Sequence, residues 1–164
     1  MHDRLSLQLL IQELDNDYAY IQESCGLLRK AGHRASASSW IDELDLMVVG
    51  ACLHGLYNAF EAYFFRIAKF FENNTDRQSW HRDLLDRMSL EIPEIRPPLI
   101  TDRALAERID ELRRFRHLFR NLYKTRLHPA KLRIVYDSAE NIGSDFRPMH
   151  VTFVEWLKLV ASSL

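Results

Sequence analysis

Glycine and proline are scarce in this chain of 164 residues, which holds five of each. β-Branched residues are also few, with six Val, ten Ile and four Thr against 24 Leu. Sheet folds need turn-forming residues between strands and β-branched residues within them, whereas Leu suits helices. The composition therefore argues against a β-sandwich, a β-barrel or a doubly wound sheet, and it predicts an all-α fold.

Long apolar runs are missing as well. The most apolar region spans Met47 to Phe71, and it is interrupted by five polar or charged side chains: His54, Asn58, Glu61, Arg66 and Lys69. A membrane-spanning helix needs about 20 predominantly apolar residues. The N-terminal segment reaches Glu13 and Asp15 too early for a secretory signal. We therefore expect no membrane segment and a cytoplasmic protein.

Cysteine is nearly absent, with Cys25 and Cys52 as the two examples. Each lies among apolar neighbours on a helix-patterned segment, and no His or Cys stands at metal-ligand spacing around it. Such cysteines are typically reduced thiols packed against a core. We expect no disulfide, no metal site and no cofactor.

Net charge is also small, at −1, but its distribution along the chain is uneven. The span from Arg103 to Arg133 carries ten Lys and Arg against three acids, a net charge of +7, and the rest of the chain carries −8. A concentrated basic stripe attracts phosphates or an acidic partner. The alternative is a solvated helix face that is balanced by acidic neighbouring helices.

Apolar residues recur every three or four positions through most of the chain, which predicts an up-and-down bundle of five to six helices in one domain, residues 1–164. Pro93, Pro97 and Pro98 make residues 89–100 an extended crossing segment. Small residues from Gly32 to Ser39, and again Gly143 and Ser144, predict breaks. The expected helices are Leu5–Lys30, Trp40–Glu72, Trp80–Met88, a basic helix capped by Thr101 or Asp102 and reaching Arg126, a segment starting at Pro129, and Met149–Ser163.

One line of the nearly all-apolar second helix is polar. His54, Asn58 and Glu61 fall at i, i+4 and i+7, on one side of that helix. Buried polar groups must find partners. They either form a core network that ties this helix to the basic one or line the wall of a cleft. Two ligands do not make a metal site.

The basic helix changes character along a single line. Leu105 and Ile109 occupy that line early in the helix, and cationic or aromatic residues occupy it later. The later residues are Arg113, Arg116, Arg120, Tyr123 and Lys124. Arg suits bidentate phosphate contacts, and Tyr stacks on bases or donates a hydrogen bond. The pattern favours binding of a nucleic acid or a nucleotide phosphate.

Three stretches carry a family resemblance: LHGLYNAFEAYFFRIAKFFE (53–72), SWHRDLLDRM followed by RPPLITD (79–102), and ELRRFRHLFRNLY (111–123). In this order and spacing the chain resembles the HepT-like branch of the HEPN superfamily, the ribonuclease toxins of toxin–antitoxin pairs. The resemblance implies a HEPN-type bundle that forms a homodimer, with an active site where two copies of the basic helix meet.

The family cleaves RNA without a metal, by attack of the 2′-hydroxyl on the adjacent phosphorus. Its catalytic pattern is Arg, four residues, His, one residue, Tyr. Arg116 and Tyr123 match this pattern, but Asn121 stands at the histidine position. Asparagine orients a hydroxyl without exchanging a proton near neutral pH. With Asn121 in place of the histidine, the site lacks a proton-transfer group. General acid–base catalysis by such a group increases the rate on the order of 10²–10⁴-fold.

Three other histidines are candidates for the missing function. His117 is the first choice because it adjoins Arg116; His128 lies near the expected helix end, and His81 lies in the second matching stretch. The remaining cations of the stripe are expected to bind RNA. They are Arg113, Arg120, Lys124 and Arg126.

In the family, a partner nucleotidyltransferase, the antitoxin, adds AMP to the motif tyrosine. Tyr123 is the matching residue, and an AMP phosphate there would neutralise the surrounding arginines and block RNA. Three hypotheses follow from the sequence. The chain is an active RNase toxin, or a catalytically impaired RNA- or nucleotide-binding partner of a nucleotidyltransferase, or a plain interaction bundle whose basic face binds an acidic protein.

Overall fold

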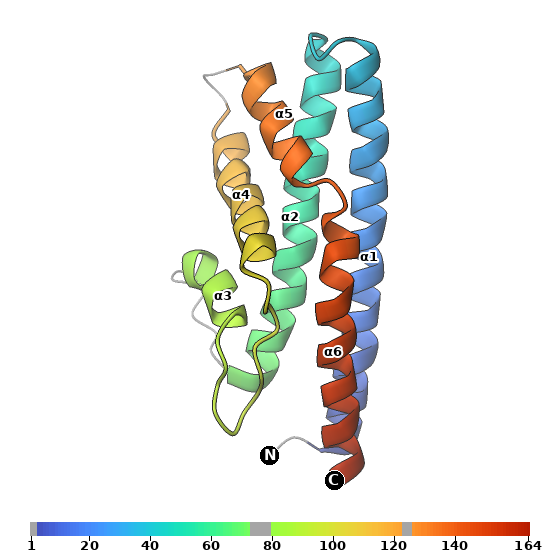
Figure 1. Cartoon of the computed structure of the whole chain (residues 1–164), viewed down its shortest axis with the longest axis vertical. Helices are drawn as coiled ribbons and strands as arrows, with labels where there is room; N and C mark the ends of the chain where they lie inside the picture. The colour runs from blue at the N-terminus through green and yellow to red at the C-terminus, as the bar shows by residue number, and fades with distance from the viewer. Residues whose placement is uncertain (1–2, 73–79, 123–125) are drawn as a thin grey trace.

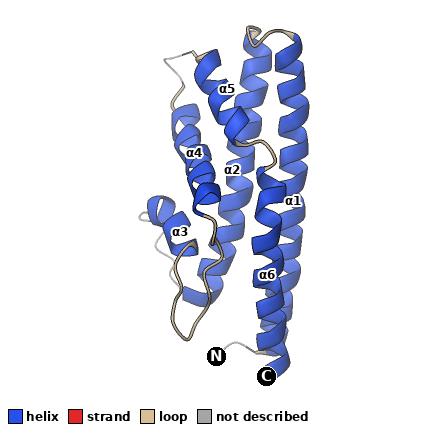
Figure 2. Cartoon of the chain, viewed as in Figure 1, coloured by secondary structure: helices blue, strands red, loops and turns tan. Residues whose placement is uncertain are grey.

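The computed structural model describes residues 3–72, 80–122 and 126–164. Its helices are α1 (Arg4–Ala37), α2 (Glu43–Glu72), α3 (Trp80–Met88), α4 (Arg103–Arg120), α5 (Pro129–Ser138) and α6 (Ile142–Ser163). Across these residues there are no strands, and a single isolated bridge joins Ile92 to Arg96. The all-α prediction is confirmed (Figure 2).

The long helices run up and down beside one another (Figure 1). α1 and α2 form an antiparallel pair, α4 runs back along α2, and α5 and α6 return in succession toward the end at which the chain begins. α3 and the loop that follows it lie beside α4. This is the up-and-down bundle expected of a HEPN-type protein, with α4 packed on α2.

The first expected break is wrong, because α1 continues through Gly32 and Ser36 to Ala37. Gly32 is buried where α1 meets α5, and a Cβ at this position would overlap the Tyr136 ring. The glycine therefore serves close helix packing rather than a turn.

The last expected break is also misplaced, because α6 begins at Ile142 instead of Met149 and includes Gly143 and Ser144. The turn lies one residue earlier, at Asn141, whose φ of 58° is left-handed. Asparagine tolerates this conformation better than most residues. Gly143 is again a packing residue, since a Cβ there would lie 3.0 Å from the Sγ of Cys25.

The crossing segment between α3 and α4 is irregular, as the prolines predict. Arg96 holds it in place with a side chain that is fully buried. The Arg96 guanidinium donates to the backbone oxygens of Leu90, Pro97 and Arg87 and to the Glu72 carboxylate, the last at 2.8 Å. These bonds tie the segment to α2 and α3 and thereby set where α4 begins.

Aromatic rings fill the centre of the bundle around Phe146, which is fully buried. Phe60 and Tyr63 meet this ring edge to face at 5.4 and 5.2 Å. Cys25 and Cys52 are free, partly buried and packed against the same core, as expected. Burial raises the pKa of both thiols, so both stay protonated near neutral pH.

A buried polar chain crosses the interface of α1, α2 and α6. The Tyr63 hydroxyl lies 2.9 Å from His150 Nδ1, His150 Nε2 lies 3.1 Å from Asp15 Oδ1, and the imidazole stacks on Tyr18 at 4.4 Å. Each ring nitrogen of His150 thus has a partner. Burial lowers the pKa of His150, against the opposing influence of the Asp15 carboxylate.

Acidification is expected to weaken the fold through His150. Its pKa is lower in the folded protein than the value of about 6.5 in an unfolded chain, so the unfolded state binds more protons and stability falls as pH drops below about 6.5. The free energy of unfolding, measured in urea at pH 7.5 and pH 5.5, should decrease with pH. The decrease should be smaller in His150→Gln; an equal decrease in both proteins would contradict this role.

None of the described helices combines the length and the apolar character needed to cross a membrane.

Candidate functional site

Polar side chains gather where α4 packs on α2, and we call this cluster the α2–α4 seam. Its members fall on one side of each helix, at three- and four-residue spacing, so they face the neighbouring helix. The polar members are His54, Tyr57 and Glu61 of α2 and Arg113, Arg116 and Arg120 of α4, and the Phe119 ring of α4 lies among them.

Arg116 lies at the centre of the seam. Its Nη1 donates to Glu61 Oε2 at 2.8 Å, and its guanidinium carbon lies 5.4 Å from the centroid of the Tyr57 ring. The Arg116 and Glu61 side chains are each 17% exposed. The Arg116 Nε is buried and has no hydrogen-bond partner among the described residues. The guanidinium is therefore held from two sides while part of its donor capacity is unused.

The Tyr57 ring packs against the Arg116 guanidinium and is itself buried, with 3% exposure. Burial, reinforced by the Glu61 carboxylate, raises the Tyr57 pKa well above its usual value. The phenol therefore stays neutral over the whole physiological pH range. It offers Arg116 the face of an uncharged ring, which attracts a cation.

His54 lies further toward the N-terminus of α2, with its ring centroid 5.7 Å from that of Phe119 on α4. The side chain is partly exposed, but its Nε2 atom is buried and lacks a partner among the described residues. Desolvation lowers the His54 pKa, and the charges of Arg116 and Arg120 lower it further. The imidazole is therefore neutral at pH 7.

The polar line expected on α2 is partly correct. Glu61 makes the tie to the basic helix that was one of the two alternatives, and His54 faces the same seam. Tyr57 was not among the predicted residues, because an aromatic residue on an apolar helix is typical of a core residue. Its spacing from His54 and Glu61, three and four residues, is the signal that could have placed it in the seam.

The predicted RNA-binding residues do not all lie together. Arg113 is half-buried and held by Asp110, with Nε 2.7 Å from Oδ1. Arg120 is exposed and has no ion pair with a described residue. Arg126 lies beyond α4 and approaches Glu43 of α2 at 3.5 Å. Lys124 lies outside the described residues.

The expected extension of α4 to Arg126 is wrong, because the helix ends at Arg120 and Asn121 caps it. The Asn121 Nδ2 donates to the His117 carbonyl at 2.9 Å, and the Asn121 backbone N–H bonds to Leu118 and Phe119 oxygens. A local side-chain bond of this kind competes with continuation of a helix. The exposed Asn121 amide is thus used for capping, away from the buried centre of the seam.

The other predicted catalytic residues are dispersed. His117 is exposed, while its neighbour Arg116 is turned into the seam. His128 is exposed at the N-cap of α5 and makes no capping bond with its side chain. Tyr123 and the side chain of His81 lie outside the described part of the chain.

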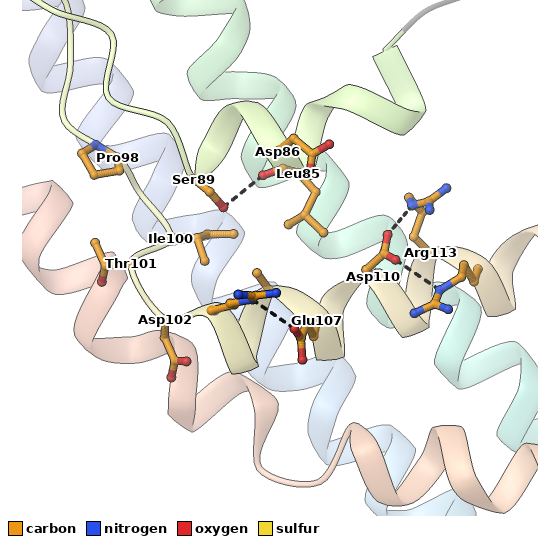
Figure 3. A pocket seen from close by; sticks show the side chains of 13 residues that line it. Leu85, Asp86, Ser89, Pro98, Ile100, Thr101, Asp102, Glu107, Asp110 and Arg113 are labelled. Atoms are coloured by element: carbon orange, nitrogen blue, oxygen red, sulfur yellow. Dashed lines mark hydrogen bonds and ion pairs between the residues drawn. The ribbon is translucent and has the colours of Figure 1, made fainter.

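A groove of about 730 Å³ opens between α3, the crossing segment and the first turns of α4 (Figure 3). Its walls mix both signs of charge: Asp110 binds Arg113 and Arg114, and Glu107 pairs with Arg103. Asp102 caps α4 through the amides of Ala104 and Leu105. The groove therefore lacks the uniformly positive wall that a phosphate chain requires, but Asp110 orients Arg113 next to Arg116.

Among the described side chains there is no group of three or more His, Cys, Asp and Glu that could hold a metal ion.

Comparison with known proteins gives one match. A family model described as HepT-like protein matches residues 48–157, a range that contains α3, α4, α5 and most of α2 and α6. Neither a curated protein nor a solved structure matches the sequence significantly. The match confirms the family resemblance carried by the three sequence stretches, and every seam residue lies inside it.

Proposed function

The chain belongs to the HepT-like protein family, and from that membership and the α2–α4 seam we propose that it is the toxin of a toxin–antitoxin pair. Its proposed activity is metal-independent endoribonuclease cleavage. The RNA 2′-oxygen bonds to the adjacent phosphorus, the bond from phosphorus to the 5′-oxygen breaks, and the products carry a 2′,3′-cyclic phosphate and a 5′-hydroxyl. Negative charge builds on the phosphoryl oxygens during this exchange.

The observation that carries the proposal is the setting of Arg116. Glu61 and Tyr57 fix its guanidinium, and the buried Nε has no hydrogen-bond partner among the described residues. A fixed, partly desolvated arginine stabilises charge that develops on phosphoryl oxygens without reorganising during the reaction. The exposed Arg120 and the oriented Arg113 extend positive charge along the same side of α4.

We further propose that the protein acts as a homodimer. Ile41, just before α2, and Leu44, in its first turn, are 78% and 76% exposed, which is unusual for large apolar side chains in a cluster. Together with Leu122 and Leu127 they line an apolar groove of about 490 Å³ just beyond the end of α4. A second copy is the occupant that would also bring two basic helices together.

The substitution Leu44→Glu is expected to shift the protein from dimer to monomer, because a charge placed in an apolar interface loses its hydration. Size-exclusion chromatography with light scattering measures the mass directly. Leu27→Glu is the matched control, since Leu27 is a 58% exposed leucine on α1. A wild-type monomer, or a dimer that persists in Leu44→Glu, would contradict the proposed interface.

The partner in this proposal is a nucleotidyltransferase antitoxin that adds AMP to Tyr123. An AMP phosphate near Arg116 and Arg120 would occupy the cationic surface that RNA needs. Mass shifts of whole AMP units on a peptide containing Tyr123, after coexpression with a nucleotidyltransferase encoded beside this chain, test this modification.

A second candidate function rests on Asn121. This residue replaces the motif histidine, and its amide is engaged in capping α4. The favoured function would fail if the site had lost proton transfer, leaving a catalytically impaired RNA- or nucleotide-binding partner of the nucleotidyltransferase. Incubation of the purified chain with labelled RNA in EDTA separates the two: the toxin cleaves, whereas the impaired protein binds RNA and leaves it intact.

A further inference from the structure

One histidine of the seam has no counterpart in the family motif. Of the histidines with described side chains, His33, His117 and His128 are exposed, and His150 is engaged with Tyr63 and Asp15 in the core. His54 is the histidine whose ring faces α4 beside Arg116. Burial and the charges of Arg116 and Arg120 on α4 act on it in the same direction, and Glu61 acts in the opposite one.

The unpaired atoms of the seam point to an external ligand. Buried nitrogen atoms nearly always have hydrogen-bond partners, and each exception calls for an explanation. His54 Nε2 and Arg116 Nε are two of the three such side-chain atoms among the described residues, and they belong to facing helices. An unpaired guanidinium N–H suits a phosphoryl oxygen, and an unpaired imidazole nitrogen suits a hydroxyl.

We propose that His54 is the proton-transfer residue of this site and takes the place of the missing motif histidine. This inference rests on the proposed RNA cleavage. Neutral His54 accepts the proton of the 2′-hydroxyl as the 2′-oxygen bonds to phosphorus. The departing 5′-oxygen takes a proton from water, and the resulting hydroxide returns the imidazolium to its neutral form.

The geometry leaves the imidazole within reach of a bound RNA. The His54 side chain is partly exposed, although its Nε2 atom is buried. The imidazole lies beside the ring of Phe119, in the last turn of α4. Because Nε2 is covered, the proposal requires side chains at this end of α4 to move when RNA binds. Tyr57 and Glu61 keep Arg116 next to this position from the same face of α2.

The charges around His54 predict the pH profile. Burial lowers the pKa of His54, the Arg116 and Arg120 charges on α4 lower it further and Glu61 of its own helix opposes them, so the pKa lies below about 6.5. The base is therefore active above that lowered pKa, and kcat should fall at acid pH with a midpoint below 6.5. Removing the positive charge at position 116 should raise the His54 pKa, which NMR titration of the imidazole measures without reference to activity.

The test uses full-length His54→Gln and His54→Phe, with His33→Gln as the matched control because His33 is exposed on α1. Both His54 variants should lose on the order of 10²–10⁴-fold in kcat, with KM changed only a few-fold, and should lose the acid limb of the pH profile. The control should retain wild-type kcat. The two replacements differ in polarity, so if one of them disturbs folding, the other can still be interpreted. Thermal unfolding followed by circular dichroism detects such a folding defect.

Three results would overturn the proposal. If a His54 variant cleaves RNA with wild-type kcat and an unchanged acid limb, His54 is excluded from proton transfer, while the proposed nuclease activity stands. A loss of kcat in His33→Gln as large as that in His54→Gln means that the loss is not specific to the seam. Absence of cleavage by the wild-type protein sinks the proposed function itself, and the catalytic role of His54 with it.

Discussion

Replacing Arg116 with alanine is expected to lower kcat/KM for RNA cleavage by on the order of 10²–10³-fold, the usual loss on removing one preorganised charge donor. Contacts with Glu61 and Tyr57 hold the guanidinium in place before the reaction, so it does not have to reorganise during the reaction. Single-turnover cleavage of a labelled oligonucleotide measures the effect. A variant that keeps the wild-type rate would exclude Arg116 from the chemistry.

Two further variants separate charge from geometry. Arg116→Lys keeps the positive charge but loses the planar fork that binds phosphate and carboxylate together, so we expect it to recover only part of the rate. Arg103→Gln is the matched control, because Arg103 is a 93% exposed arginine of the same helix. Equal losses in the Arg116 and Arg103 variants would mean that only the total charge of α4 matters.

Replacing Phe146 with alanine is expected to have the largest effect on stability, about 3–5 kcal/mol, because the site is fully buried and its aromatic neighbours cannot close the cavity. The rings of Phe60, Tyr63 and Phe64 all contact it. For a domain of this size the loss corresponds to a decrease in Tm on the order of 10 °C.

Urea unfolding of Phe146→Ala and of Leu159→Ala makes the comparison within one helix, since Leu159 is 70% exposed on α6. The control should change the free energy of unfolding by less than about 0.5 kcal/mol. If the two variants unfold at the same urea concentration, the aromatic cluster is not the centre of the core.

The fold was predictable because composition and periodicity act over long stretches. Leu-rich segments with three- and four-residue spacing specify helices, and Pro93, Pro97 and Pro98 interrupt them where the structure has its crossing segment. The breaks near Gly32 and Gly143 were misplaced because a glycine permits either a turn or close packing. In both cases a residue distant in sequence, Tyr136 or Cys25, decides in favour of packing.

The site was predictable only in part. The charge asymmetry and the family motif lead to Arg116, and the helical spacing of His54 and Glu61 leads to its partner helix. The end of α4 was not predictable, because no glycine or proline marks it and the decisive bond is local, from the Asn121 side chain to the His117 carbonyl. The spacing of Tyr57 places it on the same face of α2 as His54 and Glu61, but its contact with Arg116 needed the structure, since that contact depends on how two helices pack.

The central claim is that this chain cleaves RNA by attack of the 2′-hydroxyl at the α2–α4 seam. The most direct measurement compares an RNA oligonucleotide that the purified protein cleaves in EDTA with the same oligonucleotide carrying one 2′-deoxy residue at the cleavage site. We predict that the first yields a 2′,3′-cyclic phosphate and a 5′-hydroxyl, identified by mass spectrometry, and that the second stays intact at that position. Cleavage of both substrates, products with 5′-phosphate ends, or no cleavage of any RNA would contradict the account.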